Sequence, residues 1–183
     1  MNLPNKLSLL RVLLIPFMIF FYFHPHLFGV DEFGYYALPV IFILASFTDY
    51  VDGYLARKHN LVTTFGKFID PLADKLLVMS ALILLNAHGS LGYWITIVIL
   101  AREFIVTGIR LVAMSEGEVV AASNLGKYKT ASTMLGLTLM LLFVFGDIFS
   151  QIGLIIVYIG VVLTVVSGVD YYLKNKDYIT KSI

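Results

Sequence analysis

The sequence contains no cysteine among its 183 residues. Disulfide bridges, thiolate nucleophiles and cysteine-ligated metals are therefore excluded. Charged residues are also scarce, at 14% of the chain, whereas an average soluble protein has about 25%. The formal net charge is only +1, and no basic tract is present. This argues against nucleic-acid binding, because binding to a phosphate backbone needs clustered cations.

Hydrophobic residues make up 59% of the chain, and the mean hydropathy is +0.88. Apolar runs recur along the whole sequence, each near the roughly 20 residues needed to cross the hydrocarbon of a bilayer. Glycine, proline and asparagine residues separate these runs. We therefore predict an all-α integral membrane protein with one domain over residues 1–183. Its six transmembrane helices are predicted at residues 3–28, 34–57, 70–88, 92–115, 126–146 and 151–173.

The placement of the cations predicts the orientation. All 13 lysine and arginine residues fall in the amino-terminal segment, the second connection, the fourth run and the connection after it, or the tail. The connections at residues 24–32, 88–91 and 146–151 contain none. By the positive-inside rule, both termini are predicted to be cytoplasmic, as are the second and fourth connections. We expect a multi-pass protein of the cell membrane.

Four aspartates lie where the second run ends and the third begins. One polar stripe consists of Asp49, Asp52, Gly53, Ala56 and Arg57, and the other of Gly66, Asp70 and Asp74. Their spacings of three and four residues put each stripe on one face of a helix, so two antiparallel helices would turn four carboxylates toward each other. Each carboxylate at membrane depth costs about 2.5–3.5 kcal/mol and needs a neutralising partner.

Two kinds of partner can neutralise these carboxylates. Nearby cations, Arg57, Lys58, Lys67 and Lys75, would make a charged helical hairpin at the cytoplasmic interface. Alternatively, an oxygen-only cluster suits hard divalent cations such as Mg²⁺ or Mn²⁺. Four carboxylates can hold two such ions, an arrangement used in phosphoryl transfer. The spacing favours this second interpretation, with the site facing the cytoplasm.

The complete motif is Asp49-x2-Asp52-Gly53-x2-Ala56-Arg57-x8-Gly66-x3-Asp70-x3-Asp74. In every fixed position it resembles the signature of the CDP-alcohol phosphotransferase family. The resemblance implies a six-helix membrane fold, usually dimeric, so a homodimer is expected. It also implies transfer of a phosphatidyl or similar group from a CDP-linked donor to an alcohol, with release of CMP.

The resemblance also implies a role for each residue of the motif. The four aspartates, Asp49, Asp52, Asp70 and Asp74, would bind two divalent cations, and Asp74 would also be the general base. The CDP moiety would be held by Asp52, Gly53, Ala56, Arg57 and Gly66.

The acceptor alcohol has to be inferred from the rest of the chain. Arg102 and Arg110 lie on approximately one face of the fourth run, and Lys127 and Lys129 begin the fifth. These four cations would form an anion pocket for an acceptor that carries a phosphate. Two alternatives stay open for them. One is an ion pair between either arginine and Glu103 or the aspartates, and the second is anchoring of the fifth helix by its two lysines under the positive-inside rule.

Four segments outside the motif, residues 4–11, 102–104, 108–110 and 126–130, resemble family members that join CDP-diacylglycerol to sn-glycerol 3-phosphate. The alternatives are a family member with another acceptor, namely phosphatidylglycerol in cardiolipin formation, inositol phosphate or serine, and a cation transporter. Asn5, Ser8 and Arg11 are interpreted as a helix cap, a polar interface and a positive-inside anchor, and are not expected to contact substrate.

Overall fold

The computed structural model describes residues 2–58, 63–115 and 124–181. Over these ranges the chain forms six α-helices and no β-strand. The helices are α1 (Leu3–Phe23), α2 (Phe33–Lys58), α3 (Thr64–Ala87), α4 (Tyr93–Ser115), α5 (Asn124–Leu141) and α6 (Asp147–Lys181), with a 3₁₀ turn, η1 (Leu142–Phe145), after α5. The prediction of an all-α protein with six helices is confirmed.

The helix boundaries follow local signals that shift several predicted limits. Helix α1 ends at Phe23 rather than at residue 28, because the residue before Pro25 is disfavoured in helical conformation. Helix α3 begins six residues before the predicted start, where the Thr63 hydroxyl caps it by accepting from the Gly66 N–H at 2.9 Å. Gly66 and the aspartates after it therefore share one continuous helix, as their spacing required.

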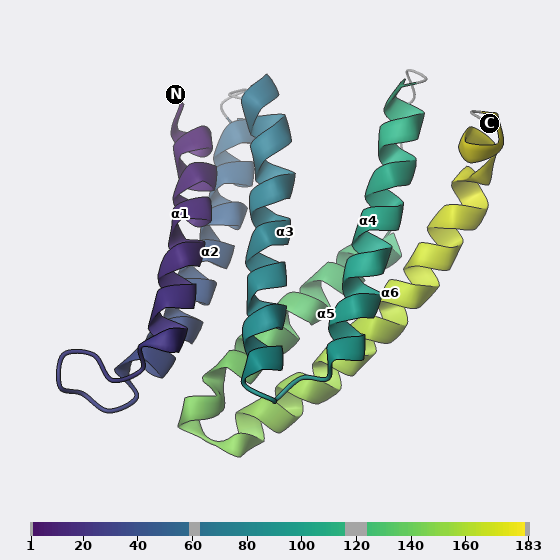
Figure 1. Cartoon of the computed structure of the whole chain (residues 1–183). Helices are drawn as coiled ribbons and strands as arrows, with labels where there is room; N and C mark the ends of the chain where they lie inside the picture. The colour runs from purple at the N-terminus through teal and green to yellow at the C-terminus, as the bar shows by residue number, and fades with distance from the viewer. Residues whose placement is uncertain (1, 59–62, 116–123, 182–183) are drawn as a thin grey trace.

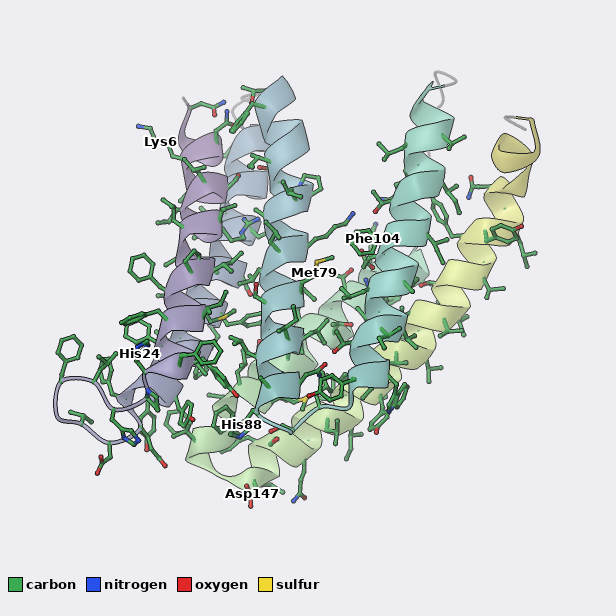
Figure 2. All side chains as sticks on the ribbon, in the orientation of Figure 1. Lys6, His24, Met79, His88, Phe104 and Asp147 are labelled. Carbon is green, nitrogen blue, oxygen red and sulfur yellow. The ribbon has the colours of Figure 1, made fainter. Side chains whose placement is uncertain are left out.

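Helices α1, α2 and α3 form one group, while α4 and α6 lie together on the other side, and α5 runs obliquely between them (Figure 1). The two groups diverge toward the end of the bundle that carries both termini. Figure 2 shows Lys6 near that end and His24, His88 and Asp147 at the opposite end. Successive helices thus alternate in direction.

Close contact between α5 and α6 depends on glycines. A Cβ at Gly153 would lie 2.6 Å from the backbone nitrogen of Met140, and one at Gly136 would lie 2.7 Å from Val157. Small residues of this kind let helix backbones approach in a bilayer, where tight packing replaces the hydrophobic effect as the source of association. The buried core continues through α2 and α3, with Phe42, Leu77 and Leu82 fully enclosed.

The outer surface is apolar over much of the bundle. Phe17, Leu13, Ile97 and Val162 are all more than half exposed, a surface that suits a lipid environment. Among the described residues, three helical segments are long and apolar enough to cross a membrane: Asn5–Phe23, Leu125–Phe145 and Asp147–Asn175. Helices α3 and α4 are also long, but each carries charged residues within its length, and these charges belong to the candidate site.

Candidate active site

The first aspartate of the motif is tied to helix α1. An Nη of Arg11 lies 3.1 Å from an Oδ of Asp49, and the Arg11 Nε donates a hydrogen bond to the carbonyl of Ala45 at 3.2 Å. Arg11 is fully buried, whereas the Asp49 side chain is 47% exposed. Its guanidinium is thus inside the bundle and neutralises a motif carboxylate, a role that the predicted positive-inside anchor did not include.

Two further polar residues of α1 face the motif. The Ser8 hydroxyl donates to Asp70 at 2.5 Å, and the Thr63 hydroxyl donates to the side-chain oxygen of Asn5 at 3.1 Å. Asn5, Ser8 and Arg11 recur every three residues, so they share one face of α1, and all three are buried. Asn5 does not cap α1, because Asn2 occupies that position. This face supports α2 and α3 instead.

Gly66 lies at the same contact between α1 and α3. A Cβ at this position would lie 2.9 Å from the Asn5 side-chain oxygen and 3.1 Å from the Thr63 hydroxyl. A side chain at position 66 would displace the Asn5 amide or the Thr63 hydroxyl, so glycine preserves this contact, whatever role it has toward a ligand.

Other residues of the motif are only partly placed. Residues 52, 53, 56 and 57 belong to the last turns of α2, but the side chains of Asp52, Ala56 and Arg57 and the surroundings of Gly53 lie outside the described part of the structure. Within that part, no three carboxylates or histidines form a metal-binding group. Asp49 and Arg11 nevertheless both act electrostatically on Asp74, so these three residues lie near one another.

A large cavity of about 780 Å³ lies between the two groups of helices. All four predicted acceptor cations line it, together with Asp49 from the motif. The full lining consists of Asp49, Arg102, Glu103, Arg110, Gly126, Lys127, Lys129, Thr130, Ala131 and Tyr171. Residues from α2, α4, α5 and α6 thus meet around one polar space, although up to 122 positions of sequence separate them.

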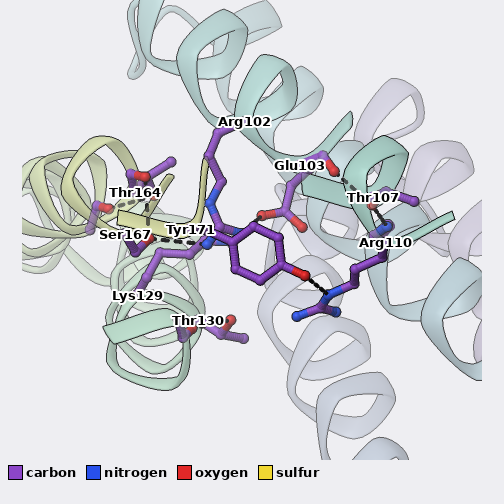
Figure 3. A network of polar contacts seen from close by, with 12 residues as sticks. Arg102, Glu103, Thr107, Arg110, Lys129, Thr130, Thr164, Ser167 and Tyr171 are labelled. Atoms are coloured by element: carbon purple, nitrogen blue, oxygen red, sulfur yellow. Dashed lines mark hydrogen bonds and ion pairs between the residues drawn. The ribbon is translucent and has the colours of Figure 1, made fainter. Parts of the chain in front are cut away.

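A network of polar contacts holds the cations of this cavity (Figure 3). Arg102 pairs with Glu103 at 3.2 Å and donates to the Ser167 hydroxyl at 3.0 Å. Lys129 also pairs with Glu103. The expected alternative, pairing of a membrane arginine with Glu103, thus holds for Arg102, and Glu103 neutralises two of the predicted cations at once.

Arg110 and Lys127 are held less tightly. The Arg110 Nε donates to the Tyr171 hydroxyl at 3.2 Å, and its guanidinium carbon lies 5.5 Å from the centre of the same ring. Both cations are exposed, and both line the large cavity. Both cations can therefore contact an anion inside this cavity.

A second, smaller cavity of about 50 Å³ extends toward α3. Asp74 and Lys75 line it, and it shares Glu103, Lys129 and Thr130 with the large cavity. The Lys75 Nζ donates to the Thr107 hydroxyl at 2.5 Å, which links α3 to α4. The expected general base and the expected acceptor pocket are therefore neighbours.

Sequence reasoning gives Glu103 only the role of an alternative partner and misses Ser167 and Tyr171. Glu103 could have been singled out as a carboxylate inside an apolar run, where ionisable residues mark functional sites. Ser167 and Tyr171 carry no such signal, because hydroxyl groups are common in membrane helices. Their contacts to α4 become visible only when α6 is placed beside it.

A helical bundle with a carboxylate motif beside a cationic cavity fits a membrane enzyme that acts on a phosphate ester. Residues 1–166 match the sequence profile of the CDP-alcohol phosphatidyltransferase family. The chain belongs to this family, as the spacing of the motif predicted.

Several relatives carry names that specify a reaction. A protein of Bacillus subtilis (strain 168) named CDP-diacylglycerol–glycerol-3-phosphate 3-phosphatidyltransferase is 46% identical over an alignment of 190 positions, gaps included, and the alignment covers 95% of each chain. Proteins of the same name from Rickettsia felis and Haemophilus influenzae are 39% and 37% identical. These alignments cover 97% of both chains in the first case, and all of this chain and 97% of the relative in the second.

Proposed function

We propose that this chain transfers the phosphatidyl group of CDP-diacylglycerol to sn-glycerol 3-phosphate, giving phosphatidylglycerophosphate and CMP. The observation that carries the proposal is the large cavity, in which Asp49 of the motif meets the cations of α4 and α5. An acceptor with its own phosphate would be held there by charge-assisted hydrogen bonds. The names of the relatives describe the same reaction.

Two divalent cations, Mg²⁺ or Mn²⁺, would be held by Asp49, Asp52, Asp70 and Asp74. The donor set fits them, because it consists of carboxylate oxygens alone, and Asp49 lines the cavity with its side chain half exposed. When bound, such cations supply Lewis-acid activation of phosphoryl oxygens.

In the proposed reaction, the free primary hydroxyl of glycerol 3-phosphate attacks the phosphorus that carries the diacylglycerol. A new P–O bond forms there, the bond from that phosphorus to the bridging oxygen of the pyrophosphate breaks, and CMP leaves. Asp74 accepts the proton of the attacking hydroxyl as general base. Its position beside Glu103 and Lys129 supports this role, because it lies next to the cations proposed to orient the acceptor.

The donor would be held from the α2 side. Asp52, Gly53, Ala56 and Arg57 at the end of α2, together with Gly66 on α3, are proposed to bind the CDP moiety, as the family motif implies. The acyl chains would remain in lipid, against the apolar outer surface of the bundle.

We further propose that all six helices cross the cell membrane, with both termini and the active site at the cytoplasmic face. The alternation of helix direction and the position of Lys6 opposite His24, His88 and Asp147 support this arrangement (Figure 2). The apolar surface would then face the bilayer, apart from the contact between two copies of the chain in a homodimer, which we also propose.

The decisive experiment measures CMP release from CDP-diacylglycerol by the purified protein in detergent with Mg²⁺. We expect release that requires both sn-glycerol 3-phosphate and Asp74. Release only with inositol phosphate, serine or phosphatidylglycerol would keep the family chemistry and replace the acceptor. Absence of release with every alcohol, together with metal flux in proteoliposomes, would favour the cation transporter instead.

A further inference from the structure

Glu103 is a carboxylate placed among cations on the wall of the large cavity. Its Oε1 pairs with both Lys129 and Arg102, and Lys75 also acts on it electrostatically. The side chains of Lys129, Arg102 and Glu103 are 8%, 14% and 20% exposed. All three groups are therefore largely withdrawn from water, and Figure 3 shows them turned toward one another.

Charges in such an environment are costly unless they are paired. Two buried cations without an anion would destabilise the bundle, so the Glu103 carboxylate stabilises the cavity while it is empty. The cavity has a second carboxylate in its described lining, Asp49, but Arg11 already pairs with that group. Within the described lining, Glu103 is the carboxylate that is paired with the predicted acceptor cations.

An acceptor phosphate in this cavity would offer Lys129 and Arg102 the same kind of oxygen ligand that Glu103 offers them. The carboxylate and the phosphate would then compete for the same N–H donors. They would also repel each other, because two anions would share one site of low dielectric. The Glu103 carboxylate therefore holds the two cations in place, and it also weakens the binding of an acceptor phosphate to them.

We propose that Glu103 is a positioning residue that substitutes for the acceptor's phosphate. Its carboxylate holds Lys129 and Arg102 before the acceptor binds and loses its contacts with them when the phosphate binds. The competition between the two anions limits the affinity for the acceptor. This inference rests on the proposed function, because it assumes that the acceptor phosphate binds beside these two cations.

The test uses inorganic phosphate as a probe, so that binding is measured apart from turnover. The purified full-length protein is thermally denatured in detergent with increasing phosphate, at an ionic strength kept constant with chloride, and the Kd follows from the rise in melting temperature. For Glu103→Gln we expect a lower melting temperature without phosphate and a Kd for phosphate about tenfold lower than in the unmodified protein. Its KM for sn-glycerol 3-phosphate should fall, while its KM for CDP-diacylglycerol is unchanged.

Two further variants sharpen the comparison. Glu103→Asp keeps the charge on a side chain one methylene shorter. Its Kd for phosphate should therefore lie between that of the unmodified protein and that of Glu103→Gln. This variant also tests the inference if Glu103→Gln does not fold. Asp170→Asn removes a carboxylate that pairs with Lys174 outside the cavity, and it should leave the Kd for phosphate unchanged.

The results distinguish the role of Glu103 from the proposed function. Glu103 variants whose Kd for phosphate equals or exceeds that of the unmodified protein would overturn the positioning role, even if the unmodified protein turns over sn-glycerol 3-phosphate normally. An unmodified protein that neither binds phosphate nor uses sn-glycerol 3-phosphate would overturn the proposed function itself, and the role of Glu103 with it.

Discussion

The guanidinium of Arg11 lies 3.1 Å from the carboxylate of Asp49. This contact joins α1 to the first aspartate of the motif, and the additional hydrogen bond from Arg11 to the Ala45 carbonyl fixes the same turn of α2. A fully buried cation thus meets a half-exposed carboxylate. The buried partner orients Asp49, while the exposed part of Asp49 remains available on the cavity wall.

Removal of the Arg11 charge should destabilise the protein. In Arg11→Met the side chain keeps much of its length but loses both contacts. We expect the free energy of unfolding to fall by about 1–2 kcal/mol, less than for a fully buried ion pair, because solvent screens the half-exposed Asp49. Thermal denaturation in detergent measures it. Lys6→Gln, on the exposed side of the same helix, is the matched control and should melt like the unmodified protein. Equal melting of Arg11→Met and this control would contradict the structural role of the ion pair.

Asp74→Asn should abolish turnover and leave the fold intact. The amide cannot accept the proton of the acceptor hydroxyl, and loss of a general base typically lowers the rate about a hundredfold or more. CMP release measures the loss, and the melting temperature reports on folding. Asp147→Asn, an exposed change at the opposite end of the bundle, should keep full activity. Retention of more than about a tenth of the activity by Asp74→Asn would rule out the assignment of the base.

Arg110 and Tyr171 should affect acceptor binding more than donor binding. Tyr171→Phe keeps the ring beside the guanidinium but loses the hydroxyl that accepts from Arg110. A hydrogen bond to a charged group contributes about 1.5–3 kcal/mol, although part of this is lost to solvent at an exposed cation. We expect the KM for sn-glycerol 3-phosphate to rise about threefold in Tyr171→Phe and about tenfold or more in Arg110→Gln.

Steady-state kinetics with each substrate varied in turn check this prediction. The KM for CDP-diacylglycerol should stay constant in both variants. Lys174→Gln, which removes an exposed cation paired with Asp170 on the same helix as Tyr171, serves as the control. A uniform fall in activity without any change in KM would indicate that Arg110 supports the fold and not the acceptor.

The α5–α6 contact should tolerate no side chain at Gly153. In Gly153→Ala the new methyl group would lie 2.6 Å from the backbone nitrogen of Met140, and overpacking of this kind costs about 1–3 kcal/mol. Gly108→Ala is a matched helical control, since a Cβ there meets nothing within 4 Å. We expect a lower melting temperature for Gly153→Ala only. Equal melting temperatures for the two variants would show that α5 and α6 accommodate the extra methyl group without a loss of stability.

Much of the fold can be predicted because hydrophobic composition leaves few options. An apolar chain in a bilayer must satisfy its backbone hydrogen bonds internally, so long apolar runs become helices. Helix ends are harder to predict, because they depend on single residues such as Thr63, whose hydroxyl caps α3. Helix α6 is also longer than its apolar run, since its last turns are polar and carry no apolar signal.

The sequence by itself determined which side chains share a helix face, because the three- and four-residue spacings of the motif follow directly from helix geometry. It also determined the family, through residues at fixed spacings within one hairpin. The partner of each charge was decided only by the tertiary structure. Ser8 and Asp70 lie 62 residues apart, Arg110 and Tyr171 61 apart, and Glu103 and Lys129 26 apart. No local periodicity relates positions so distant, and only the packing of α1 on α3, α4 on α6 and α4 near α5 brings their side chains within reach.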